Sequence, residues 1–331
     1  MSSDPRQDMD LLGQIVRAAG RREAAPPEIR DRVFAAASAT LQIKLRSRRK
    51  RTLWQMAVAA AVLAAVGIGF ATLQNSQALP VALSDQFVGD ATFRSVEGGS
   101  WAPLARDRKL LTGSQLRTGR GGRVGLILVQ GASLRLDELT DVRLLSPSRV
   151  EVLAGTVYVD SRATSDTIEV VTPVGITRDV GTQFEVRYRD RLQRVRVREG
   201  AVLMQVGTGE FRGVAGEQFL ASPTGGVQRA AIATNDGSWE WVQLVARAPD
   251  IENMPLSALL EWVARETGRP VRYDSDAVRA LTRSTILHGS IRNLAPLPAV
   301  QTVIATTDLE LAILPDGSLL VRGRDRGDDI R

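Results

Sequence analysis

The residue types that could do catalytic or metal chemistry are few in this chain, and they are not arranged for it. There is one histidine, His288, and no cysteine, so neither a thiolate site nor a histidine-rich zinc site can be assembled. A Ser-His-Asp arrangement would need His288 as its base, but no G-x-S-x-G motif precedes it, and 286–289 is typical of a partly exposed strand. Asp and Glu are scattered, so a carboxylate dyad stays open but unsupported. The sequence predicts no catalytic residue, no metal ligand and no cofactor.

Other groups that attract notice have simpler interpretations. The glycine-rich loop 119–122 opens a strand and lacks the helix N-terminus that a phosphate site uses. Arg178 and Asp179 flank Gly181, and we expect them to be solvated in a turn. Three tryptophans could form a surface that stacks on sugars, but we expect them to pack between domains. They are Trp239, Trp241 and Trp262.

One long apolar segment divides the chain into a short N-terminal arm and a long C-terminal arm. Residues 53–73 read LWQMAVAAAVLAAVGIGFATL, in which only Gln55 and Thr72 are polar. A helix of this length spans about 31 Å, the thickness of a bilayer hydrocarbon core. We predict a single transmembrane helix. Two alternatives stay open: a cleaved signal peptide, since 76–78 (SQA) resembles a cleavage site, and a buried core helix.

Positive charge is concentrated just before this segment. Residues 1–51 hold twelve Lys and Arg against six Asp and Glu, a net charge of +6 that equals the net charge of the whole chain. The remainder is therefore neutral, and we predict that it does not bind nucleic acid. Because Lys and Arg accumulate on the cytoplasmic side, the N-terminus is predicted to be cytoplasmic. The residues that determine this topology are Lys44, Arg46, Arg48, Arg49, Lys50 and Arg51.

The short arm, residues 1–51, has the pattern of two amphipathic helices. One begins near Asp8, and the second opens at Pro26 and Pro27, where proline suits the first turn. Two such helices bury their own apolar faces poorly, so either they pack on each other weakly or a partner supplies a groove. A flexible tether with transient helices is the alternative. The candidate contact residues are Leu12, Ile15, Val16, Val33 and Phe34.

Downstream of the apolar segment, apolar residues alternate with polar ones over short runs separated by glycines. A period of two is typical of strands with one buried face. We predict a juxtamembrane linker with the first strands over 74–103, then an all-β domain over 104–221, built as a sandwich, barrel or solenoid. The alternating positions are Val124, Leu126, Leu128, Leu134, Leu136, Val150, Val152, Val157, Val159, Ile168, Val170, Phe184, Val186, Tyr188, Val195, Val197, Val202, Met204 and Val206.

The last third of the chain changes period. Residues 222–244 are rich in turn residues and are interpreted as a linker, and 245–322 as a small α+β module followed by a polar tail, 323–331. Leu256, Leu259, Leu260 and Val263 form one helix face, which Gly268 ends. The other elements predicted are strands at 271–273 and 285–291, a second helix around 297–304, and a hairpin of 309–314 with 318–321.

Six motifs in order resemble the FecR domain of bacterial transmembrane signalling proteins, over roughly 104–205. They are 116–119 (LRTG), 131–136 (GASLRL), 152–157 (VLAGTV), 171–175 (VTPVG), 181–186 (GTQFEV) and 195–202 (VRVREGAV). The positions in these motifs that we expect to be structural are Gly131, Gly155, Gly175, Gly181, Thr182, Phe184 and Gly200. The C-terminal module is similar to the short N-terminal domain of secretins and TonB-dependent transducers.

The FecR resemblance implies a regulator in the bacterial inner membrane, with its N-terminus in the cytoplasm and its C-terminus in the periplasm. The short arm would bind an extracytoplasmic-function (ECF) sigma factor, and the periplasmic part would sense the signalling domain of an outer-membrane TonB-dependent receptor or another periplasmic partner. The chain departs from the family in one respect. Many FecR proteins carry a Trp-containing helical signature in the cytoplasmic segment, whereas residues 1–51 contain no Trp. The alternative is a membrane-anchored periplasmic binding or scaffold protein of the cell envelope that does not contact a sigma factor.

Overall fold

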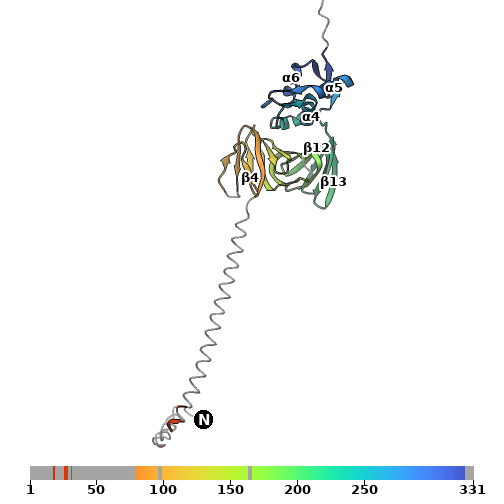
Figure 1. The fold of residues 1–331 in the computed structure, drawn as a ribbon. Helices are drawn as coiled ribbons and strands as arrows, with labels where there is room; N and C mark the ends of the chain where they lie inside the picture. Colours follow the sequence, from red (N-terminus) through yellow and green to blue (C-terminus); the bar gives the residue numbers. More distant parts are fainter. Residues whose placement is uncertain are drawn as a thin grey trace, which may run out of the picture. The chain divides into compact units, whose positions relative to one another are not determined.

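The computed structural model describes residues 79–95, 99–162, 166–224 and 226–324, together with residues 18, 26–28 and 31 (Figure 1). The chain divides into two compact units, Met1–Gln77 and Ala78–Arg331.

The predictions for the short arm and the apolar segment fall outside the described residues. They are the span 53–73, the basic residues of 44–51, and the apolar set Leu12, Ile15, Val16, Val33 and Phe34. Across the described ranges, no helix combines the length and the apolar character needed to cross a membrane.

In the described part of the second unit, fifteen strands join into one hydrogen-bonded sheet, here called the β domain. They are β1 (Pro80–Val88), β2 (Ala91–Arg94), β3 (Ala102–Pro103), β4 (Lys109–Leu111), β5 (Gln115–Thr118), β6 (Arg123–Leu128), β7 (Ser133–Leu136), β8 (Asp141–Ser146), β9 (Arg149–Asp160), β10 (Glu169–Val171), β11 (Gly175–Arg189), β12 (Leu192–Val206), β13 (Gly209–Val214), β14 (Glu217–Ala221) and β15 (Val227–Ala231). The predicted all-β character is confirmed.

Three long strands, β9, β11 and β12, change partners halfway and so divide the sheet into two layers. The first half of β9 pairs with β8 and β10, whereas its second half pairs with β7 and β11. The first layer therefore runs β2, β5, β8, β9, β10, β11, β12, β13, and the second runs β4, β1, β6, β7, β9, β11, β12, β14, β15. Strands that switch layers at a bend are a known way of closing a sandwich.

A glycine with a positive φ marks the change of partner in each long strand. The φ angles are +94° at Gly155 in β9, +68° at Gly181 in β11 and +79° at Gly200 in β12. At Gly155 a Cβ atom would also lie 2.4 Å from Thr140 Cα, so a side chain has no room. The positive φ favours glycine at all three positions, and at Gly200 a Cβ atom would also lie 2.7 Å from the carbonyl oxygen of Gly181. Three of the predicted motif positions therefore have a structural role.

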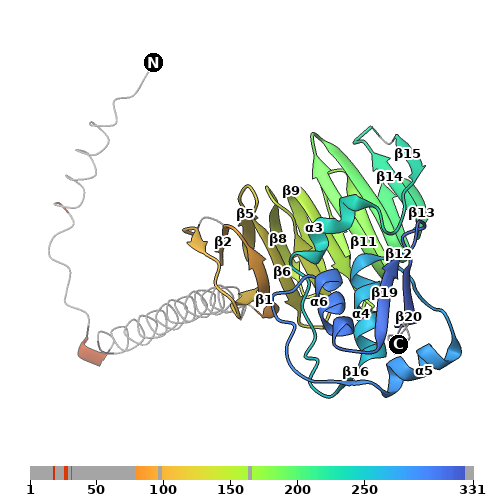
Figure 2. The same cartoon turned by 90° about the horizontal axis from the view of Figure 1, so that it is seen from above.

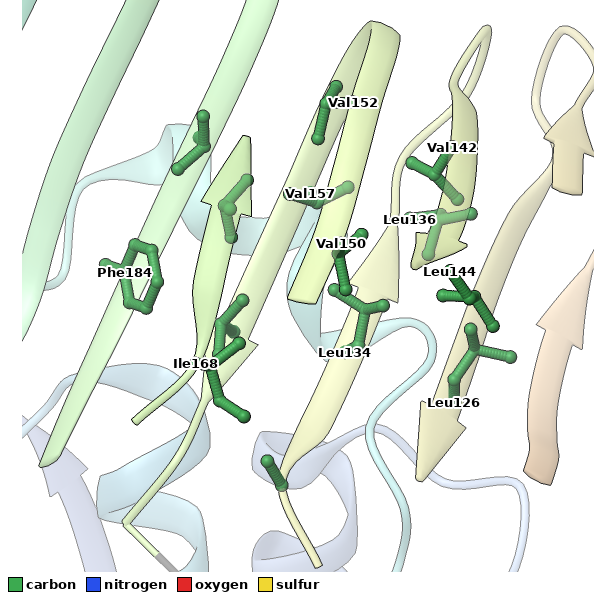
Figure 3. Close-up of a cluster of buried hydrophobic side chains, with 14 of the residues drawn as sticks. Leu126, Leu134, Leu136, Val142, Leu144, Val150, Val152, Val157, Ile168 and Phe184 are labelled. Atoms are coloured by element: carbon green, nitrogen blue, oxygen red, sulfur yellow. The ribbon is translucent and has the colours of Figure 1, made fainter. Parts of the chain in front are cut away.

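The core lies between the two layers. Side chains of β6 and β7, from the second layer, and of β8 and β9 gather in one cluster (Figure 3). The alternating apolar positions predicted from the sequence are fully or nearly fully buried there, except Tyr188, which is partly buried against the cluster. Each buried Val, Leu or Phe contributes roughly 1.5–3 kcal/mol through the hydrophobic effect.

The C-terminal module follows the β domain through a connecting segment, 232–253. That segment contains η1 (Gly237–Trp239) and α3 (Glu240–Gln243). The module comprises β16 (Met254–Pro255), α4 (Leu256–Thr267), β17 (Val271–Tyr273), α5 (Asp276–Ser284), β18 (Ile286–Leu287), α6 (Pro296–Ala305), β19 (Leu309–Ile313) and β20 (Leu319–Gly323). Helices α4 and α6 share one apolar core with the three-stranded sheet β17–β20–β19.

Three sequence interpretations need correction here. The linker assigned to 222–244 contains strand β15, which pairs with β14, and a buried helical turn around Trp239. The strand predicted at 285–291 is only two residues long in β18. Helix α5 was missed because it is short and mostly polar, and only Val278 and Thr282 on it are buried. Its N-cap, Ser275, was the available signal.

Candidate functional site

The outer face of the second layer carries a row of polar and aromatic side chains that follows the strand register. Arg135 on β7 lies opposite Tyr158 on β9, and Tyr158 lies opposite Glu185 on β11. Glu185 in turn faces Arg196 on β12, which faces Gln218 on β14. On a free sheet face these side chains would contact water. Arg135, Tyr158 and Glu185 are instead buried, because α3 and the C-terminal module lie over this face (Figure 2).

A buried ion pair joins the module to this row. Arg135 donates from Nη1 to Glu266 Oε2 at 2.6 Å and from Nη2 to Oε1 at 3.1 Å, and the two side chains are 3% and 1% exposed. Nη1 also donates to the carbonyl of Val242 at 3.0 Å. Burial alone would lower the pKa of Arg135, but the charge and hydrogen bonds of Glu266 outweigh it and the pKa is raised. Arg135 therefore stays charged and depends on Glu266 for compensation.

The C-terminal end of α4 docks through its free carbonyls. Arg198 on β12 donates from Nη1 to the carbonyl of Glu266 at 3.0 Å and from Nε to the carbonyl of Thr234 at 2.9 Å. Gln183 on β11 donates to the carbonyl of Arg265 at 3.4 Å. The last carbonyls of a helix lack intrahelical partners and form the negative end of its dipole, so a guanidinium satisfies both their hydrogen bonding and their charge.

Aromatic packing surrounds this polar contact. Trp239 is 1% exposed and meets Tyr158 edge to face, with ring centroids 6.1 Å apart. Burial raises the pKa of Tyr158 to about 12, although the nearby charge of Arg198 opposes the shift. The predicted packing of tryptophans between domains is confirmed for Trp239. Trp262 belongs to the module's own core instead.

The connecting segment also approaches the sheet closely at Gly125 on β6. A Cβ atom there would lie 2.7 Å from the carbonyl oxygen of Val245. The chain of the connecting segment can therefore lie directly on β6 only because position 125 has no side chain.

The predicted motif residues do not gather at this interface. Phe184 is fully buried in the β-domain core, and Thr182 is buried at the β11 bend, where its hydroxyl donates to the carbonyl of Ala201. Gly131 lies in the turn between β6 and β7, and Gly175 begins β11. Asp179 departs from expectation: it is 2% exposed and accepts from the Ser161 hydroxyl and the Ile168 amide, so it is not solvated.

Sequence reasoning missed Arg135, Arg198 and Glu266. Arg135 and Arg198 alternate with the buried apolar residues of their strands, which is also the pattern of an ordinary solvent-facing position. Glu266 lies between two polar residues, Arg265 and Thr267, at the end of α4, so it also resembles a solvent-facing position. The available signal was Tyr158, a large aromatic residue at an outward-facing position of β9.

The residue types considered for catalysis or metal binding are His288 and the scattered carboxylates. Among the described residues, no group of three or more His, Cys, Asp and Glu side chains is placed to hold a metal. His288 follows β18 at the surface, and its Nδ1 lies 2.8 Å from Glu252 Oε1. The Gly289 amide and His288 lower the pKa of Glu252.

Residues 114–203 match the FecR family, described as FecR protein. The match lies inside the domain where the sequence resemblance was found, so that part of the resemblance is confirmed. The likeness of the C-terminal module to secretin and transducer domains stays a prediction.

Comparison with solved structures gives weaker similarities. Two crystal structures of a candidate anti-sigma factor from Parabacteroides distasonis are 16% and 17% identical to this chain, cover 63% and 62% of it and 98% and 97% of their own chains, and have TM-scores of 0.35. A cell surface anchoring domain is 18% identical and covers 20% of this chain and 87% of its own, with a TM-score of 0.19. No curated protein matches the chain.

Proposed function

We propose that this chain is a single-pass regulator in the inner membrane of a bacterium that binds an ECF sigma factor. The observation that carries the proposal is the match of 114–203 to the FecR family. The apolar segment 53–73, with a basic stretch before it, supports placing the short arm in the cytoplasm and the β domain and module in the periplasm.

In this proposal the C-terminal module meets a periplasmic partner, the signalling domain of a TonB-dependent receptor or another protein. The module is attached to the β domain through a small number of directional contacts, chiefly the Arg135–Glu266 pair. A partner that binds the undocked module better than the docked one would shift the equilibrium toward release. The proposed signal is thus a change in docking, and the short arm is the output.

The sigma-factor contact is tested by co-purification with the full-length protein in detergent. Replacing Leu12 and Ile15 with Asp places two charges on the predicted apolar face and should abolish capture of an ECF sigma factor. Gln14→Asp, predicted to lie off that face, is the matched control and should capture normally. Equal capture by the double variant would exclude that face as the contact.

The envelope scaffold remains the alternative because residues 1–51 lack the Trp-containing signature. It predicts that no sigma factor co-purifies with the parent protein. Membrane placement is tested separately: a phosphatase fused after Ser84 should be active, and one fused after Arg46 inactive. Activity at Arg46 would reverse the proposed topology.

A further inference from the structure

An open cavity of about 280 Å³ lies beside α3 on the outer face of the second layer. Its walls come from two parts of the unit. Strands β11 and β12 supply a cluster of arginines, and the connecting segment supplies a hydroxyl and an indole. The residues that matter for its chemistry are Arg187, Arg189, Arg194, Arg196, Ser238 and Trp241.

The carboxylates around this cavity are already engaged. Asp137 accepts from Arg123 Nε at 2.8 Å, and Glu138 accepts from the Gly121 amide at 2.7 Å. Glu185 accepts from Arg194 Nη2 at 2.9 Å and lies 3.9 Å from Arg196.

Two of the arginines have no such compensation. In the part of the chain that the structure describes, no carboxylate forms an ion pair with Arg187 or Arg189. Four arginines and three carboxylates line the cavity, and one of these carboxylates, Asp137, is also paired with Arg123 outside the lining, so the cavity carries an excess of positive charge.

The clustered arginines destabilise the fold at this position. Arg187 lies directly opposite Arg194 in the β11–β12 ladder, and like charges in that position are destabilising. Nε of Arg194 is buried without a hydrogen-bond partner among the described residues. Burial lowers the pKa of Arg196; Glu185 opposes the shift, while Arg194 and Arg187 add to it. A bound anion would relieve both the repulsion and the unpaired donor.

We propose that this cavity binds a small oxyanion carrying two or more negative charges on phosphate or carboxylate groups, held by Arg187 and Arg194. The guanidinium fork matches both groups. A cavity of about 280 Å³ lies just below the usual range of roughly 300–1,000 Å³ for ligand pockets, which favours a small ligand. Because Ser238 and Trp241 also line the cavity, the ligand bridges the β domain and the connecting segment. Binding requires neither the sigma factor nor the membrane.

The test is isothermal titration of the full-length protein in detergent with inorganic pyrophosphate and, separately, with malonate. The variant is Arg187→Gln, because removing Arg187 leaves no buried carboxylate unpaired. Arg212→Gln on β13, an exposed arginine of the other layer, is the matched control. We expect saturable binding of at least one probe by the parent and by the control. In Arg187→Gln the affinity should fall about tenfold or more, while the melting temperature without ligand stays equal or rises.

The probe that binds identifies the chemical group of the ligand. Binding of pyrophosphate alone assigns phosphate, and binding of malonate alone assigns carboxylate. If only vesicles containing phosphatidic acid bind, and do so through Arg187, a lipid headgroup supplies the phosphate. No saturable binding of pyrophosphate, malonate or such vesicles would overturn the proposal, as would affinity unchanged in Arg187→Gln.

Discussion

The two faces of the second half of strand β9 are both buried, but by different chemistry. Val157 points into an apolar core shared by the two layers of the β domain. Tyr158, the next residue, points to the outer face, where Arg135, Glu266 and Trp239 surround it. The core relies on non-directional burial, whereas the module is held by an ion pair and hydrogen bonds that depend on geometry. We therefore expect the docked module to be released more easily than the core of the β domain is opened.

A charge placed in the apolar core should destabilise the protein most. Val157→Asp places an unpaired charge in the core, which costs several kcal/mol and should unfold the β domain. Val180→Asp on β11 is the control, because Val180 is 61% exposed. Circular dichroism with thermal melting distinguishes them. A folded Val157→Asp protein with the parent's melting temperature would show that the face of β9 has been misassigned.

Glu266→Gln removes the charge that compensates Arg135 in the docking contact. It leaves Arg135 charged and buried without a counter-charge, and losing one partner of such a pair costs about 3–5 kcal/mol. We expect the module to undock, so that protease cleaves the connecting segment, while the core of the β domain keeps its melting transition.

Replacing both members of the pair, Arg135→Met with Glu266→Met, tests whether the uncompensated charge causes the undocking. Removing a buried pair as a whole is often neutral or stabilising, so the double variant should resist cleavage better than Glu266→Gln. If Glu266→Gln resists protease as well as the parent does, the ion pair does not hold the module.

The core of the β domain could be predicted from the sequence, whereas the contacts that dock the module could not. Alternating Val and Leu residues predicted the core positions because burial in a sheet imposes a period of two. Helix α4 was predicted because Leu256, Leu259, Leu260 and Val263 share one face that the module buries. Arg135 and Glu266 could not be paired, since they lie 131 residues apart and each resembles a solvent-facing position. Directional contacts between modules leave no period in a single sequence.

The pKa of Tyr158 reports docking directly. It is raised from 10.0 to about 12 chiefly by burial, so docking favours the neutral phenol. The stability that this group contributes is therefore complete below pH 10 and is lost as the pH rises through about 12. In Glu266→Gln the module undocks, and the pKa should fall toward its ordinary value, about 10.

Tyrosinate absorbance measures this pKa, and Tyr158→Phe identifies which step of the titration belongs to Tyr158. A step that stays near pH 12 in Glu266→Gln would mean that the burial of Tyr158 does not depend on the docked module.

An Arg–Glu pair at the surface should contribute far less than the buried pair. Arg322 donates from Nη2 to Glu310 Oε2 at 2.9 Å, but these side chains are 53% and 40% exposed. Water already solvates both charges, so an exposed pair contributes only about 0–1 kcal/mol. Glu310→Gln should therefore shift the thermal midpoint slightly, and less at high salt. Measured beside Glu266→Gln under identical conditions, it isolates burial as the variable. If the two substitutions cost the same, burial does not set the strength of the docking contact, and the contrast between the two sides of β9 loses its energetic basis.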